Sequence, residues 1–182
     1  MVADMEIPLV SRDYFDRSRR RLESATPALW DLLDQVRDPE VPVLSIWDLG
    51  VLRDVAREGG RIVITITPTY SGCPAMETIR GDIERVMIGA GFDRVEVRTE
   101  LAPAWSSTWL SPEGRDKLRE YGIAPPGDGV ADAGGLTAAT GVACPHCGSI
   151  DTRRISEFGS TACKALFQCN DCSEPFDYFK KI

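Results

Sequence analysis

Histidine is nearly absent from this sequence: the 182 residues include one, His146. A papain-like hydrolase pairs its cysteine with a histidine base, and the first 140 residues offer none. Long apolar runs are missing too, because no stretch approaches the roughly 18 residues that span a bilayer. The amino terminus carries acids where a secretion signal has a basic and then an apolar segment. We therefore expect a cytoplasmic protein that does not enter the membrane.

Positive charge is also scarce. Lys and Arg total 21 against 28 Asp and Glu, which gives a formal charge of -7. Such a surface repels phosphate backbones, so nucleic acid is disfavoured as a partner. The basic stretch RSRRRLE at 17–23 is an exception that could mark an anionic partner, although such runs are more typical of a solvated tail or helix face.

Cysteine is distributed unevenly. Cys73 stands alone in the first 140 residues, whereas the other five lie between Cys144 and Cys172. The intervening Gly-, Pro- and Ala-rich segment has no apolar periodicity and is typical of a mobile linker. With 43% hydrophobic residues, the chain can build one ordinary core and a small second module. We expect four segments: a tail (1–25), a domain (26–123), a linker (124–142) and a cysteine-rich domain (143–182).

Local patterns predict the elements of the first domain. Thr26-Pro27 is a helix start, and Gly59-Gly60 joins the two strands of a hairpin. An apolar stripe at helical spacing predicts a helix that follows Pro74 and ends near Gly89, and alternation predicts a strand within 94–101. A short helix should follow Ser111-Pro112 and end at Gly122. Together these elements predict an α+β fold, with a small mixed sheet and helices on one side.

Cys73 lies at or next to the start of the predicted helix, since Pro74 suits a first helical position. Unpaired first-turn amides stabilise a thiolate, so we expect the pKa of Cys73 to fall below about 8.5. Such a thiol could be a nucleophile, a redox centre or a soft ligand for iron or copper. Free cysteine is also a common buried filler, and position alone does not decide between these interpretations.

Two C-x-x-C units, Cys144/Cys147 and Cys169/Cys172, predict a closed tetrahedral zinc site in a zinc ribbon. Iron in a cluster or a rubredoxin-type site is the alternative. A thioredoxin-like role is disfavoured because no βαβ pattern surrounds the motif. We expect the ring of His146 to point outward. The sequence does not decide the role of Cys163, which could be a buried filler, a substitute ligand or a second functional thiol.

The segments DPEVPVLSIWDLGVL and ITITPTYSGCPAM together resemble the domain of SufT-like iron-sulfur assembly proteins, over about residues 29–101. That family has an Asp-Pro-Glu turn and one exposed cysteine after a Thr-Pro-Thr segment. The resemblance implies that one site is lined by Asp38, Glu40, Thr67, Thr69 and Cys73. It also implies that Cys73 is the reactive or metal-contacting group and could hold a transient iron ion or iron-sulfur cluster.

Two further segments, APAWSSTWLSPEGRDKLREYGIAPP and FGSTACKALFQC, extend a resemblance to the D subunits of phenylacetate degradation (PaaD/PaaJ type) over nearly the whole chain. It implies an accessory or maturation factor of the phenylacetyl-CoA 1,2-epoxidase, with oxygenase and reductase subunits as partners. Their metal centres, a di-iron site and a [2Fe-2S] cluster, would be assembled with the help of Cys73. The chain itself is not the oxygenase, since a di-iron bundle needs Glu-x-x-His pairs that one histidine cannot supply. A non-catalytic subunit that stabilises the complex is the alternative.

Overall fold

The computed structural model describes residues 10–127 and 141–182. Its helices are α1 (Arg12–Glu23), α2 (Pro27–Leu33), α3 (Ala75–Gly89), α4 (Pro112–Glu120) and the 3-10 helix η1 (Ser107–Trp109). Its strands are β1 (Leu52–Glu58), β2 (Arg61–Ile66), β3 (Val95–Thr99), β4 (Ile123–Ala124), β5 (Thr152–Ser156), β6 (Lys164–Cys169) and β7 (Pro175–Phe179). The predicted α+β class is confirmed, with two small mixed sheets.

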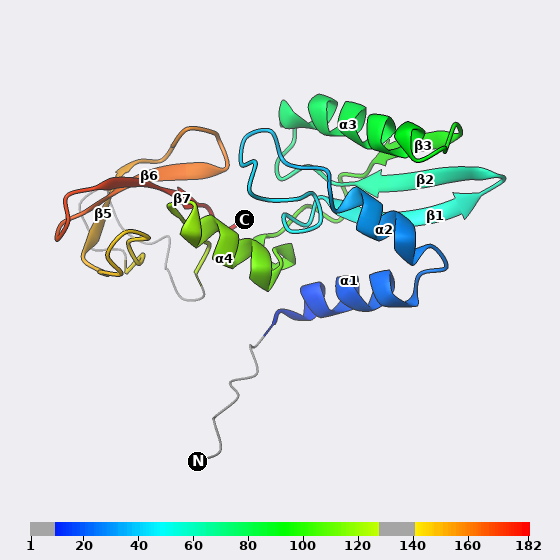
Figure 1. Ribbon diagram of the computed structural model, residues 1–182. Helices are drawn as coiled ribbons and strands as arrows, with labels where there is room; N and C mark the ends of the chain where they lie inside the picture. The colour runs from blue at the N-terminus through cyan, green and yellow to red at the C-terminus, as the bar shows by residue number, and fades with distance from the viewer. Residues whose placement is uncertain (1–9, 128–140) are drawn as a thin grey trace, which may run out of the picture.

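The first sheet has the order β1-β2-β3. β1 and β2 form the predicted antiparallel hairpin, and both Gly59 (φ 54) and Gly60 (φ 82) have the positive φ that tight hairpin turns require. β3 pairs with β2 in parallel, which a crossover through α3 makes possible. α3 packs beside this sheet (Figure 1) and buries Ile79, Ile83 and Met87.

The amino-terminal segment differs from the expected tail, because residues 12–23 form helix α1. Ser11 caps it by accepting a hydrogen bond from the N–H of Tyr14 at 3.1 Å. The buried Arg17 donates to the carbonyl oxygen of Trp47 at 2.9 Å and stacks on the Trp47 ring. Arg21 pairs with Asp31 and Asp34. The basic stretch therefore holds α1 on the protein and is only partly solvated.

The second sheet has the order β4-β7-β6-β5, and its first strand comes from the end of the preceding domain. Ile123 and Ala124 pair in parallel with Asp177 and Tyr178, so the ribbon sheet begins at the boundary assigned to the linker. Most of the expected linker, residues 128–140, lies outside the described residues.

The two modules share one core. Phe179 of β7 is 1% exposed and packs on Trp105, with ring centroids 6.0 Å apart. The carbonyl oxygen of Ile182 accepts a hydrogen bond from the N–H of Ser107 at 3.0 Å. A smaller ribbon core lies on the other side of the sheet, around Phe167 and Phe176. In the described residues the ribbon is therefore packed against the first domain, whereas the sequence suggested a module on a tether.

The search for membrane spans covered the described residues, and none of the helices there is both long enough and apolar enough to cross a bilayer.

Candidate metal and thiol sites

The Asp-Pro-Glu turn is built around the Asp38 carboxylate. Its Oδ1 accepts hydrogen bonds from the N–H of Glu40 at 2.9 Å and of Val41 at 2.7 Å. Burial raises the pKa of Asp38, and these two N–H groups oppose the shift. One oxygen of Asp38 thus closes the turn, which leaves the half-buried Glu40 as the more available carboxylate.

The Cys73 thiol sits between β2 and α3, one residue before the helix cap Pro74. Gly72 has φ 85, a conformation that suits glycine, and the N–H of Cys73 donates to the Tyr70 carbonyl oxygen at 3.2 Å. The N–H of Ala75 and the side chains of Tyr70 and Thr69 favour the thiolate and so lower the pKa of Cys73 in part. Cys73 is half-buried and remains within reach of a ligand.

The prediction that the pKa of Cys73 is lowered is wrong. Burial raises the pKa of its thiol, and the nearby charge of Glu40 raises it further, while the Ala75 N–H lowers it only in part. The amide effect assumed from the sequence is present, but desolvation and a carboxylate outweigh it. The thiol is therefore protonated at neutral pH in the free protein.

The two threonines of the predicted site are buried, and their roles differ. Thr69 favours the thiolate form of Cys73 and so lowers the pKa of that thiol in part. Thr67 is 1% exposed, and its hydroxyl has no hydrogen-bond partner among the described residues. Tyr70 was missed by sequence reasoning, although it follows Thr69 directly. Burial raises the pKa of Tyr70 to about 12, with further contributions from Cys73 and Glu40.

The four ribbon cysteines come together as their spacing suggested. The Sγ atoms of Cys144, Cys147, Cys169 and Cys172 all lie within 4.8 Å of one another. Cys144 and Cys172 are 3.7 Å apart, and Cys147 and Cys169 are 3.6 Å apart. The N–H of Cys172 donates to the sulfur of Cys169 at 3.5 Å. His146 is exposed and does not belong to the cluster.

This cluster fits a single tetrahedral ion. With a Zn–S bond of about 2.3 Å, the edges of a zinc tetrathiolate are about 3.8 Å, close to the observed separations. A cluster of two or four irons would distribute the thiolates over separate metals and hold them further apart. All four positions are taken by protein, which is typical of a structural site.

Cys163 and Lys164 lie near the first site although they belong to the ribbon. Cys163 is 5% exposed and Lys164 is 3% exposed. Lys164 affects the pKa values of both Asp38 and Glu40, which burial raises and its positive charge lowers. No sequence motif signalled this contact, since the two partners are more than 120 residues apart in the chain.

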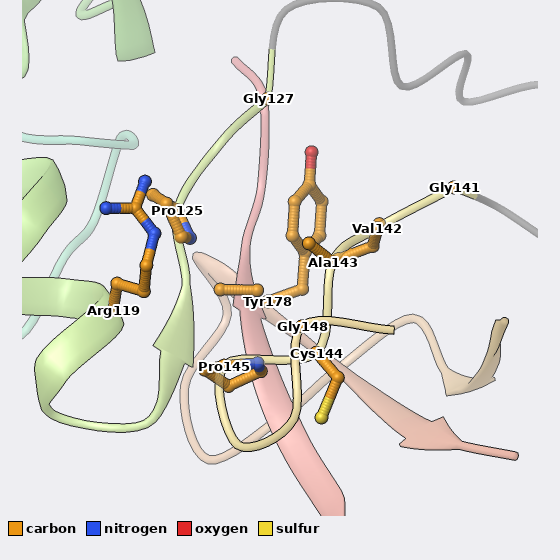
Figure 2. A pocket seen from close by; sticks show the side chains of 11 residues that line it. Arg119, Pro125, Gly127, Gly141, Val142, Ala143, Cys144, Pro145, Gly148 and Tyr178 are labelled. Atoms are coloured by element: carbon orange, nitrogen blue, oxygen red, sulfur yellow. The ribbon is translucent and has the colours of Figure 1, made fainter. Parts of the chain in front are cut away.

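A pocket of about 480 Å³ lies between the end of the first domain and the ribbon loop that carries Cys144 (Figure 2). Arg119, Pro125 and Tyr178 contribute to its wall, and of the predicted site residues only Cys144 lines it. The sulfur of Cys144 points away from the Tyr178 ring in this view. The pocket is thus separate from the Cys73 site.

Comparison with known proteins agrees with this two-part architecture. The family described as iron-sulfur cluster assembly protein matches residues 27–98, and the PaaD zinc beta ribbon domain matches residues 130–180. A relative from Bacillus subtilis (strain 168), "Fe-S protein maturation auxiliary factor YitW", is 36% identical over 91 residues, covering 49% of this chain and 80% of that protein. Fold and matches together define an iron-sulfur assembly domain joined to a zinc ribbon.

A relative from Escherichia coli (strain K12), described as the D subunit of a "Putative 1,2-phenylacetyl-CoA epoxidase", is 52% identical over 154 residues, covering 85% of this chain and 92% of that protein. The chain belongs to this PaaD family.

Proposed function

We propose that the protein is an accessory maturation factor of the phenylacetyl-CoA 1,2-epoxidase system, which carries iron or an iron-sulfur unit on Cys73 to a metal-containing subunit. Two relatives support the two parts of this proposal, the epoxidase system and the maturation role. One is described as the D subunit of an epoxidase and the other as an Fe-S maturation factor. The assembly-family match spans all five predicted site residues, Asp38, Glu40, Thr67, Thr69 and Cys73.

The observation that carries the proposal is the surroundings of Cys73. The thiol at the entrance of α3 is half-buried, and its pKa responds both to polar groups that favour the thiolate and to the charge of Glu40. This combination offers iron one soft and one hard ligand.

The protonated state of the thiol bears on the chemistry. The thiolate is the nucleophile, so a raised pKa disfavours attack on a persulfide donor. A metal ion, in contrast, displaces the thiol proton when it binds. Iron is therefore favoured over a persulfide as the cargo of Cys73.

Structural zinc is our proposal for the ribbon cysteines. The ion would stabilise the module that packs Phe179 into the shared core, and it would catalyse nothing. We expect the oxygenase and reductase subunits to be the partners.

The test is the metal content of those subunits after co-expression with wild type, Cys73→Ser, or the matched control Ser71→Ala, which alters an exposed neighbour in the same loop. Iron in the purified oxygenase and the [2Fe-2S] absorption of the reductase should fall with Cys73→Ser to the level seen without the protein. Ser71→Ala should load both fully. Full loading by Cys73→Ser would contradict the proposal.

A non-catalytic interaction subunit is the second candidate, and the raised pKa and partial burial of Cys73 favour it. In that case Cys73→Ser would leave metal content and activity intact, whereas deleting the whole protein would dissociate the complex. Size-exclusion chromatography of the co-expressed subunits separates the two functions.

A further inference from the structure

Helix α1 gathers positive charge on an acidic chain. Its five arginines and three acids give it a formal charge of +2, whereas the whole chain carries -7. The helix lies on the outside of the first domain (Figure 1), and it precedes the assembly-family match, which begins at residue 27. α1 is therefore a feature that this chain has in addition to the matched assembly domain.

The inner face of α1 is fixed to the protein. Arg17 donates to the carbonyl oxygen of Trp47 at 2.9 Å, and the Thr108 hydroxyl donates to the Asp13 carboxylate at 2.7 Å. At the other end of the helix, Arg20 donates to a carbonyl oxygen of β1 at 3.3 Å. The helix thus presents its outer face in a defined orientation, which reduces the entropy lost when a partner binds.

The outer face of α1 carries two large apolar side chains. Phe15 is 57% exposed and Leu22 is 83% exposed. They are seven residues apart, close to two helical turns, so they lie on the same face, and the exposed Arg19 lies between them. Aromatic residues and arginine are enriched at protein interfaces, so this composition is typical of a surface that binds another protein.

A hollow of about 450 Å³ lies beside the carboxyl-terminal end of α1, between this helix and the edge strand β1. Arg20 lines the hollow from α1 and Arg57 lines it from β1, together with the acids Glu23 and Asp54. Leu22 lies in the same turn of α1 as Glu23. The hollow and the apolar pair therefore belong to one continuous surface.

The arginines of the hollow have no internal counter-ion. Within the described part of the chain, no carboxylate lies within 4.0 Å of the guanidinium nitrogens of Arg20 or Arg57. Arg19 and Arg21, in contrast, each pair with a carboxylate. Two cations that need not give up an existing ion pair can accept a carboxylate from another protein at little cost.

We propose that the α1–β1 surface, formed by Phe15, Arg19 and Leu22 together with the hollow that Arg20 and Arg57 line, docks an acidic segment of a partner protein. Apolar side chains of that segment cover the exposed pair, and a carboxylate enters the hollow. The acidic remainder of the chain repels such a segment, so it is directed to this surface. The inference deepens the proposed function by naming the surface that holds the client, and it rests on that function for the choice of client.

The test uses the purified oxygenase and reductase subunits as probes, each titrated calorimetrically with the full, zinc-loaded chain. Wild type should bind one of them. Phe15→Ala/Leu22→Ala should bind it at least about 10-fold more weakly, because truncation of a central apolar contact typically has an effect of this size. Ile88→Ala, which alters an apolar side chain on α3 that is 64% exposed, is the matched control and should bind as wild type does.

The charge contribution is measured by repeating the titrations at about 50 and about 300 mM KCl, since salt screens exposed charges. Wild type should bind more weakly at the higher concentration. Arg20→Glu/Arg57→Glu should bind more weakly than wild type at low salt and should lose most of the salt dependence. Arg94→Glu makes the same change at an exposed arginine outside the surface, and it should keep the wild-type affinity.

Photocrosslinking identifies the segment that is bound. With p-benzoylphenylalanine in place of Leu22, irradiation of the complex should attach the chain to an acidic peptide of the client, which mass spectrometry identifies. The same group in place of Ile88 should give little product. Crosslinks from position 22 that are confined to basic peptides, or that are no more frequent than those from position 88, would contradict the proposal.

The docking surface and the role of Cys73 fail in different ways. Wild-type affinity in Phe15→Ala/Leu22→Ala, or a wild-type chain that binds neither subunit, would overturn the docking surface, and loading that still depends on Cys73 would leave the proposed function standing. Cys73→Ser should bind the client normally and fail to load it. Full loading by Cys73→Ser together with weak binding by the surface variant would overturn the proposed function and leave the docking surface intact.

Discussion

The ribbon knuckle, formed by Cys144, Cys147, Cys169 and Cys172, and the Cys73 site of the first domain both offer thiols to a metal, but they do so in opposite ways. The knuckle takes four thiols from two short motifs, places them within 4.8 Å and leaves no position open. The Cys73 site offers one half-buried thiol, whose pKa is raised by burial and by the charge of Glu40. A closed site retains its ion and stabilises a fold, whereas an open one can release it. The difference explains why one chain would need both.

Removing a knuckle ligand should have the largest effect. Structural zinc contributes apparent binding free energies of about 10–16 kcal/mol in small zinc modules, so Cys169→Ser should lose zinc and unfold the ribbon. Because Cys163 and Phe179 would leave the shared core, alkylation of Cys73 should become faster. Elemental analysis and limited proteolysis of 141–182 measure the outcome, with Cys73→Ser as the control that keeps its zinc. A zinc-free ribbon that still resists protease would show that the knuckle metal does not stabilise the fold.

Loosening the core that the two modules share, without changing any cysteine, should have the next largest effect. Phe179→Ala removes a ring that is 1% exposed and packs on Trp105, at a cost of about 3–5 kcal/mol in the free energy of unfolding. Zinc should stay bound while alkylation of Cys73, which packs against the same core, becomes faster. Phe158→Ala, on the exposed ribbon surface, is the matched control and should change stability little. Urea unfolding and the rate of Cys73 alkylation are the measurements, and an unchanged alkylation rate in Phe179→Ala would show that the shared core does not shield Cys73.

A smaller loss of stability should follow from Asp48→Asn, away from both sets of thiols. Burial alone would raise the pKa of Asp48, but hydrogen bonds from Lys117, the N–H of Ser45 and the Ser111 hydroxyl lower it overall. The folded pKa thus lies below the unfolded value of about 3.9, so this stabilisation is present above that pH and is lost as the pH falls through the folded pKa.

We expect Asp48→Asn to cost about 1–3 kcal/mol at neutral pH, and less in acid. The value is modest because the partner Lys117 is 40% exposed. Urea unfolding at both pH values checks it, against Asp116→Asn, whose exposed pair with Arg119 should contribute less than about 1 kcal/mol. Metal binding at the knuckle and at Cys73 should be unaffected. An equal loss of stability in acid and at neutral pH would contradict the linkage.

The sequence predicted those features that depend on residues close together in the chain. Thr26-Pro27 starts α2, Gly59-Gly60 turns the hairpin, and the C-x-x-C spacing brings the four thiols together. Features that depend on the packing of distant segments could not be predicted from the sequence. The pKa of Cys73 depends on burial and on Glu40, neither of which is visible in the helix-start pattern.

The contribution of the ribbon was hidden for a related reason. No sequence motif links Cys163 and Lys164 to the Asp-Pro-Glu turn, which lies more than 120 residues earlier in the chain. Only the packing of the two modules brings them near that turn. The segment expected to be a tail forms helix α1, because Arg17 and Arg21 turn toward the protein, whereas the sequence suggested a solvated tail or helix face.

Iron-edge X-ray absorption of the Fe²⁺-loaded, zinc-replete wild-type protein tests the central claim most directly, because zinc in the knuckle does not contribute at the iron edge. The account predicts one sulfur ligand, from Cys73, at about 2.3 Å together with oxygen ligands. Four sulfurs around iron, or none, would contradict it.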